Sequence, residues 1–153
     1  MPTATCHQVN EYETVTRMCC FSKSVLVCRH FTVSVDGASV IAGDLQFNVG
    51  NGTPNIENVA RTATAAGTPR SVFLLTAYML AYLEAGNQFN TVRVAAAHNG
   101  VLALDRAGFV AKTHHVGKAL ALAGQELECT TIGAARLACL ALFNASNPGY
   151  VIN

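Results

Sequence analysis

The sequence predicts a single α/β domain with a mixed, mainly antiparallel sheet flanked by helices. Three observations favour this class. A hairpin pattern surrounds Asp36-Gly37, a long apolar helix is expected over Val72 to Leu83, and an apolar segment typical of a buried strand follows at Thr91 to Ala97. A strand expected at Ile56 to Ala63 would complete a β-α-β unit, whose two strands run parallel.

Length and composition limit the possible classes of protein. The 153 residues suit one domain, 1–153, which is large enough to bury a hydrophobic core without disulfides or a structural metal. Charged residues make up only 12% of the chain, about half of the usual share. Two explanations stay open: partner proteins cover much of the surface, or the chain is a compact Ala-rich enzyme. A net charge of +1 offers no electrostatic support for binding nucleic acid or a membrane.

The six cysteines include no C-x-x-C spacing, and no histidine lies at zinc-ligand spacing from a cysteine pair. We therefore expect no metal and interpret the cysteines as small buried hydrophobes of a reducing cytoplasm. Residues 1–13 lack a basic start and an apolar run, so we expect no signal peptide. The longest apolar segment, Val72 to Leu83, is too short to span a bilayer. We expect synthesis in the cytoplasm.

The first part of the chain is expected to hold a helix and a hairpin. Val9 to Cys20 is weakly amphipathic with acidic residues at its start, which favours a helix. Ser24 to His30 is β-branched enough to be a strand. Apolar and polar residues alternate on both sides of Asp36-Gly37, which indicates a hairpin, and Gly43 is expected to mark a bulge. The composition of Asn48 to Asn55 is that of a loop.

The central helix is expected to start with Thr68 as N-cap and Pro69 as its first residue, and to end at Gly86-Asn87. Because Val72 to Leu83 is apolar almost all the way round, this helix must be packed on both sides. A short helix, Gly100 to Ala107, and a returning strand, Phe109 to His115, are predicted after the next strand.

The C-terminal region is expected to contain one more helix. An apolar pattern on one face predicts it from Ile132 to Phe143, with Thr130 or Thr131 as its cap and Pro148 beyond its end. Glu126 to Cys129 is a candidate strand before this helix.

The segment Thr91 to Phe109 reads TVRVAAAHNGVLALDRAGF, a strand, a turn, a short helix and Gly-Phe. With the order of the other elements, it resembles the GNAT acetyltransferase superfamily over about residues 3–115. The resemblance implies a GNAT-like sheet, with residues 116–153 and their helix as an addition. The plan looks most like the small, degenerate GNAT-like proteins of short-tailed phages.

In that superfamily, backbone N–H groups at a helix N-terminus bind the pyrophosphate of acetyl-CoA. The resemblance implies cofactor contacts at Gly67, Thr68, Arg70 and Asn99. Two positions depart from the pattern: Thr64 replaces a Gln or Arg, and Pro69 has no N–H to donate. The alternative interpretation is a structural helix with a good cap.

The superfamily often uses a tyrosine in the helix before Gly-Phe as its general acid. Leu104 holds that position here and cannot donate a proton. His98 and Glu57 are the remaining candidates for a catalytic acid or base, and each also has a purely structural interpretation.

Three hypotheses about function follow. The first is a non-catalytic, degenerate GNAT-like protein that serves as a structural or accessory component of a larger assembly, a phage virion above all, with other protein subunits as partners. The second is an active N-acyltransferase with acetyl-CoA as its cofactor. The third is a viral coat or decoration protein of another fold.

Overall fold

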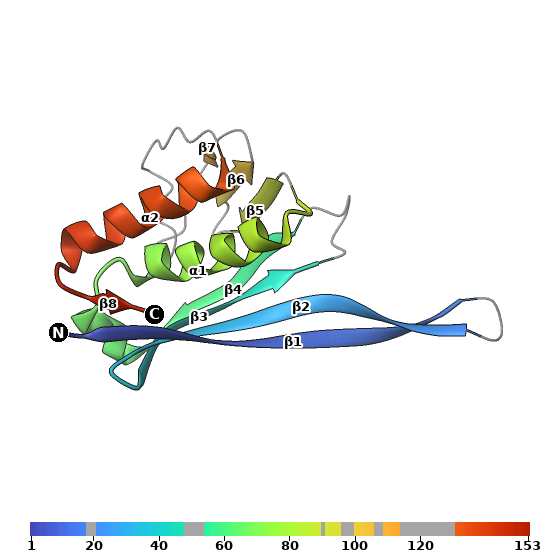
Figure 1. Cartoon of the computed structure of the whole chain (residues 1–153), viewed down its shortest axis with the longest axis horizontal. Coiled ribbons are helices and arrows are strands. Elements are labelled where there is room, and N and C mark those ends of the chain that lie inside the picture. The colour runs from blue at the N-terminus through green and yellow to red at the C-terminus, as the bar shows by residue number, and fades with distance from the viewer. Residues whose placement is uncertain (18–20, 48–53, 90, 96–99, 106–108, 114–130) are drawn as a thin grey trace.

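The computed structural model describes residues 1–17, 21–47, 54–89, 91–95, 100–105, 109–113 and 131–153. Over these residues, a curled sheet carries two helices on one face (Figure 1). The described strands lie side by side in the order β7-β6-β5-β4-β3-β2-β1-β8, with mostly antiparallel neighbours. The predicted α/β class with a mixed sheet is therefore confirmed.

The elements follow one another along the chain as a strand meander, a β-α-β unit, a second meander and a C-terminal helix and strand. They are β1 (Thr3–Arg17), β2 (Phe21–Val35), β3 (Ala38–Gln46), β4 (Asn55–Arg61), the 3₁₀ helix η1 (Ala63–Gly67), α1 (Ser71–Gly86), β5 (Thr91–Ala95), β6 (Gly100–Asp105), β7 (Phe109–Thr113), α2 (Ile132–Ser146) and β8 (Val151–Ile152).

The hairpin around Asp36-Gly37 is confirmed. Asp36 and Gly37 have φ angles of 49° and 84°, the left-handed conformation that a two-residue hairpin turn needs and that glycine adopts without strain. β2 runs without a break from Phe21 to Val35, so the strand expected at Ser24 to His30 and the alternating residues after it form one element.

The helix predicted at Val9 to Cys20 is wrong. Residues up to Arg17 belong to β1, which pairs antiparallel with β2 from Ala4↔Val35 to Arg17↔Phe21, and residues 18–20 lie outside the described part. Pairing with β2 outweighs the weak helical preference of this segment, because it supplies backbone hydrogen bonds along the whole segment.

The β-α-β unit from β4 through α1 to β5 is confirmed, and its strands pair parallel at Asn55↔Arg93 and Ile56↔Val94. A bulge lies beside Gly43 but in the neighbouring strand β4, since Gly43 itself pairs in regular register with Phe31. The pairing of β3 with β4 shifts between Ala42 and Asp44, and the additional residue lies in β4, where Asn58 has a φ of 55°.

The predicted start of α1 is wrong by two residues. Residues 63–67 form η1. Thr68 is buried and donates its N–H to the carbonyl of Ala65. The N-cap of α1 is instead Arg70, which has a left-handed conformation. The predicted end is confirmed, because Asn87 is left-handed and donates its N–H to the carbonyl of Leu83.

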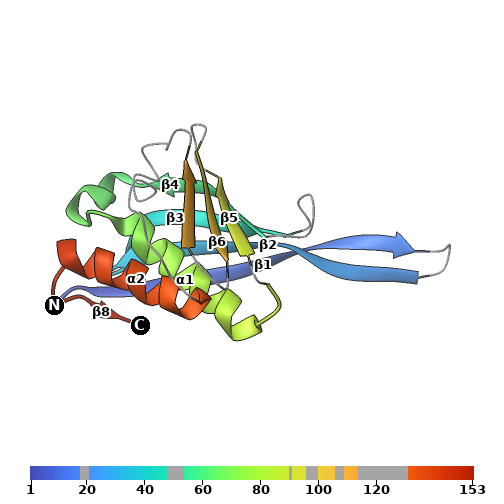
Figure 2. The ribbon, with the colours of Figure 1, turned by 90° about the horizontal axis from the view of Figure 1, so that it is seen from above.

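α1 is packed on both sides, as its uniformly apolar sequence requires. It lies between the sheet and α2 (Figures 1 and 2), and its buried residues include Leu74, Leu75, Met79 and Leu80. The core also contains Phe31, Ile41 and Leu45 from the sheet and Phe143 from α2.

The helix predicted at Gly100 to Ala107 is also wrong. Residues 100–105 form β6, the middle strand between β5 and β7, and residues 106–108 lie outside the described part. The short apolar run VLAL is compatible with a helix or a strand. It forms a strand because it pairs with a strand on each side. The returning strand predicted from Phe109 is confirmed as β7.

The C-terminal helix is confirmed as α2, and Thr131 caps it by accepting a hydrogen bond from the N–H of Ala134 at 3.0 Å. β8 then pairs parallel with the first residues of β1 and brings the two termini together (Figure 1). The loop predicted over residues 48–53 and the strand predicted at Glu126 to Cys129 lie outside the described residues. No helix in the described part of the chain is long and apolar enough to cross a bilayer.

Candidate functional site

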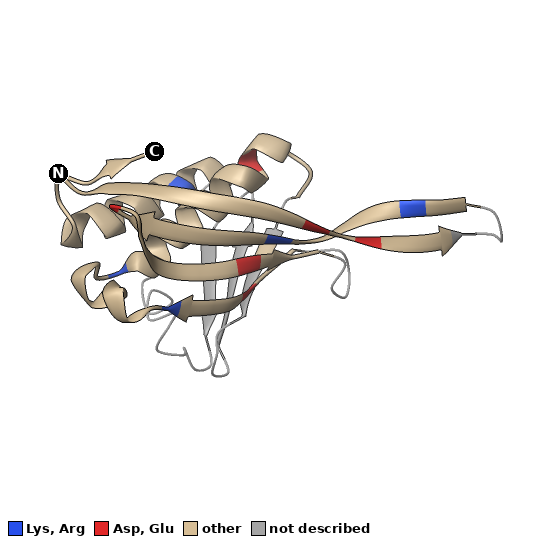
Figure 3. Cartoon of the chain, turned by 90° about the horizontal axis from the view of Figure 1, so that it is seen from below, with Lys and Arg blue, Asp and Glu red and all other residues tan. Residues whose placement is uncertain are grey.

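A cluster of polar side chains lies on the face of the sheet that the helices leave uncovered (Figure 3 looks onto this face). Cys28 and His30 are two residues apart on β2 and therefore point to the same side. Asp44 lies directly opposite His30 on β3, and Glu11 lies opposite Cys28 on β1. Three neighbouring strands thus place a thiol, an imidazole and two carboxylates together.

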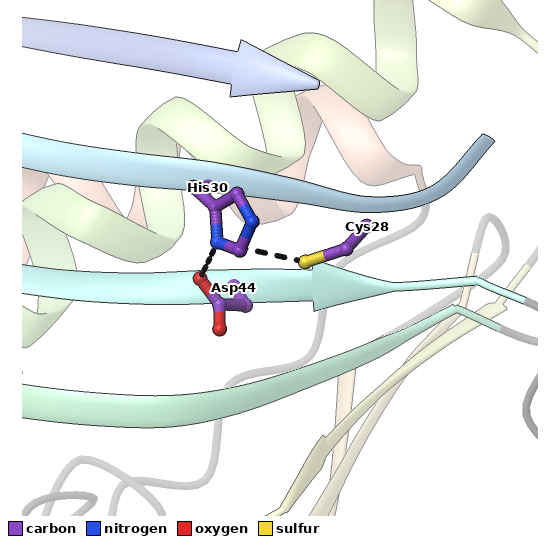
Figure 4. Close-up of side chains that lie close together, drawn as sticks. All are labelled: Cys28, His30 and Asp44. Atoms are coloured by element: carbon purple, nitrogen blue, oxygen red, sulfur yellow. Dashed lines mark hydrogen bonds and ion pairs between the residues drawn. The ribbon is translucent and has the colours of Figure 1, made fainter. Parts of the chain in front are cut away.

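The imidazole of His30 is the centre of this cluster (Figure 4). Its Nδ1 lies 2.7 Å from Oδ1 of Asp44 and 3.7 Å from Sγ of Cys28. Its other nitrogen, Nε2, lies 3.1 Å from Oε1 of Glu11. Each ring nitrogen therefore has a carboxylate partner, and the ring is fixed between them.

The carboxylates set the proton affinity of the histidine and of the thiol. Hydrogen bonds from the ring to Asp44 and then to Glu11 raise the pKa of His30 above its ordinary value, because both stabilise the protonated ring. Burial first, and then the nearby carboxylates with Asp44 foremost, raise the pKa of the Cys28 thiol to about 11. Around neutral pH, Cys28 is therefore a protonated thiol when no cation is present.

This geometry does not suit nucleophilic catalysis by cysteine. In a catalytic triad, the acid and the nucleophile bind opposite nitrogens of the histidine. Here Asp44 and Cys28 both approach Nδ1, while Glu11 occupies Nε2. A thiol with a raised pKa is also a poor nucleophile. The cluster is better suited to holding a cation than to attacking a substrate.

The cofactor-binding residues implied by the sequence lie elsewhere, at the start of α1. Gly67 ends η1 and is exposed, and Arg70 is exposed with its guanidinium 5.8 Å from the ring centroid of Phe73. Thr68 is only 3% exposed, and its N–H is already donated to a carbonyl within η1. Asn99 and His98 lie outside the described residues.

Glu57 is the only sequence-predicted candidate near the polar cluster among the described residues. It lies on β4 opposite Asp44 and is half-buried, so the structural alternative for Glu57 is a residue of the sheet and not of an exposed loop. Its carboxylate contributes to the raised pKa of Cys28. The structure thus places Glu57 beside a cluster whose central members sequence reasoning missed.

A pocket also lies between the end of α1 and the start of α2. Its volume is about 190 Å³, and its lining includes Leu83, Phe89 and Ile132. Binding sites for small molecules and cofactors usually enclose about 300–1,000 Å³, so this pocket is too small for acetyl-CoA.

Comparisons with known proteins add no relative. The chain matches no protein-family model, no curated protein and no solved structure. Arguments about function therefore rest on the residues and geometry of this chain.

Proposed function

We propose that the chain is a non-catalytic structural or accessory subunit of a larger protein assembly, built on a degenerate GNAT-like plan. A phage particle is the assembly that the sequence resemblance suggests. The observation that carries the proposal is a two-stranded ribbon, defined here as residues 12–17 of β1 and 21–26 of β2, which extends well beyond the rest of the domain in two perpendicular views (Figures 1 and 2).

The ribbon lacks the support that two strands normally need. β3 accompanies β2 only as far as Val27, which accepts the N–H of Phe47, and β8 pairs with β1 only at Thr3 and Ala4. Beyond these points, no strand in the described part of the chain pairs with either outer edge of the ribbon. An isolated two-stranded hairpin is marginally stable in water, and exposed edges favour pairing with another chain.

The ribbon also exposes large hydrophobic side chains. Tyr12 at its base is 59% exposed, and Phe21 near its tip is 71% exposed. A tyrosine and a phenylalanine each offer a large contact area, which is why aromatic residues are enriched at protein interfaces. Together with a charged fraction of only 12%, this favours a ribbon that is covered in the assembled state.

The partner that best fits the ribbon is a second copy of this chain. Glu13 lies near the base and Lys23 nearer the tip, and both are exposed. The register places them on the same face, since Glu13 pairs with Val25 and Lys23 with Val15. Two ribbons packed antiparallel about a two-fold axis would bring each glutamate near the lysine of the other copy.

Light scattering during size-exclusion chromatography tests this proposal on the full chain. We expect a dimer or larger oligomer that dissociates on dilution, and weaker association for Phe21→Ser, because Phe21 lies on the same face of the ribbon as Glu13 and Lys23. Leu137→Ser is the matched control, since Leu137 is 58% exposed on α2, away from the ribbon. A protein that is monomeric at every concentration would overturn the proposal.

An active acetyl-CoA-dependent N-acyltransferase is the second candidate, and one feature favours it. β4 and β5 pair at only two positions, and Figure 2 shows β5 running at a steep angle to β4. Such a divergence between parallel strands is where an extended ligand could reach backbone groups. Against it, η1 uses the N–H groups of Ala65 and Thr68 internally, and Pro69 has none.

Calorimetric titration with acetyl-CoA separates the two candidates. The structural proposal expects no heat of binding at millimolar acetyl-CoA. Saturable binding that Arg70→Ala weakens would favour the acyltransferase. A viral coat or decoration protein remains compatible with the ribbon, because that function depends on assembly rather than on acetyl-CoA.

A further inference from the structure

The donor atoms of Cys28, His30 and Asp44 converge closely enough to share one ion. Nδ1, Sγ and a carboxylate oxygen all lie within 4.8 Å of one another. In a tetrahedral zinc site with bonds of about 2.0–2.3 Å, neighbouring ligand atoms are separated by roughly 3–4 Å. The separations of 2.7 Å and 3.7 Å from Nδ1 are near this range, so small side-chain rotations suffice.

Each of the three side chains is also held by a second polar group. Oε1 of Glu11 lies at hydrogen-bond distance from Nε2 of His30, which assigns a proton to Nε2 and leaves Nδ1 for a metal. Asn58 donates from Nδ2 to Oδ2 of Asp44 at 3.0 Å, so Oδ1 remains directed at the histidine. Gln46 donates from Nε2 to Sγ of Cys28 at 3.4 Å. Metal ligands in proteins are typically oriented by such outer partners.

The local charge favours a cation at this point. The carboxylates of Asp44, Glu11 and Glu57 oppose formation of a Cys28 thiolate, and a divalent ion placed among them reverses this effect. A protonated His30 between two carboxylates would by itself account for the ion pairs. It does not account for the thiol beside Nδ1 or for the amide that donates to the thiol sulfur.

We propose that Cys28, His30 and Asp44 bind one divalent transition-metal ion, with Zn²⁺ as the best match to a sulfur, nitrogen and oxygen donor set. Binding displaces the thiol proton of Cys28 and the Nδ1 proton of His30 to solvent. The side chain of His30 is 42% exposed, so a water molecule can complete the coordination. This site is independent of the proposed role of the ribbon.

Titration of the chelator-treated full chain with Co²⁺ tests the proposal, because cobalt bound by a thiolate gives a charge-transfer absorption band. We expect one equivalent to bind, with the band lost on addition of Zn²⁺. Cys28→Ser should abolish the band, and His30→Gln or Asp44→Asn should weaken binding at least tenfold. Glu11→Gln, which changes only an outer partner, should weaken it about 10–100-fold.

Matched controls separate this site from other thiols and imidazoles. Cys6→Ser and His7→Gln change the same residue types on β1, away from the three donor atoms, and should leave the titration unchanged. Circular dichroism of each variant confirms that it is folded. Absence of the band in the parent chain, or an unchanged band in folded Cys28→Ser, would overturn the proposal.

Discussion

Leu75 of α1 lies directly over Gly43 of β3. A Cβ atom added at Gly43 would lie 3.0 Å from Cδ2 of Leu75, 3.2 Å from Cε of Met79 and 3.3 Å from Cγ2 of Val59. The missing side chain therefore lets the helix approach the sheet closely at the point where β4 bulges. The glycine therefore serves the packing of the central helix against the sheet.

Gly43→Ala should lower the free energy of unfolding by about 1–3 kcal/mol, because the added methyl group overpacks the contact between α1 and the sheet. Urea denaturation measures the change. Gly67→Ala is the control, since nothing lies within 4 Å of a Cβ at that position. Equal effects of the two substitutions would show that the close contact with Leu75 does not limit stability.

Tyr78 connects α1 to both ends of the chain through hydrogen bonds from its hydroxyl group. We expect the protein to lose stability at alkaline pH because of this residue. Its hydroxyl lies 2.9 Å from the carbonyl oxygen of Asn153 and 3.3 Å from that of Ala4. Burial raises the pKa of Tyr78 to about 12, from an ordinary value of 10.0. Between these pH values, the folded state holds a proton that the unfolded state releases, so the free energy of unfolding falls as pH rises.

Urea denaturation at a series of pH values from about 8 to about 12, an interval that includes the ordinary pKa of tyrosine, checks this prediction. Tyr78→Phe should be less stable at neutral pH by about 0.5–1.5 kcal/mol, with a shallower alkaline decline. Tyr12→Phe, at an exposed position, should keep the parent's decline. A decline of the same slope in Tyr78→Phe would assign the alkaline loss to other groups.

Thr131 provides the side-chain cap of α2, and its hydroxyl oxygen accepts the N–H of Ala134. Thr131→Ala should cost about 1 kcal/mol of stability because that N–H then lacks its partner. Thr131→Ser keeps the hydroxyl and should retain most of the stability in the same thermal or urea experiment. If serine and alanine are equally destabilising, the cap is not the cause.

The hairpin and the central β-α-β unit could be predicted because local signals specify them. Asp36-Gly37 has the chemistry of a tight turn, and Val72 to Leu83 is too apolar to lie on a surface. β1 and β6 could not be predicted in this way. Both segments are strands because neighbouring strands pair with them, and that pairing leaves no clear mark in the segment's own pattern of apolar and polar residues.

The polar cluster escaped prediction for a similar reason. Cys28 and His30 are visible in sequence as a pair on one face of a strand, but their partner depends on register. Continuing the pairing Val35↔Ala38 without interruption would place Gly43 opposite His30. A register shift between Val33 and Ser34 moves the pairing by one residue and places Asp44 there instead.

The central claim is that two ribbons pack against each other, and a charge-swap series measured by sedimentation equilibrium tests it most directly. Glu13→Lys and Lys23→Glu should each weaken self-association by about tenfold, because each change makes two symmetry-related contacts repulsive. The double variant Glu13→Lys/Lys23→Glu should regain most of the parent's affinity. A monomeric parent chain, or single variants that associate as tightly as the parent, would contradict the claim.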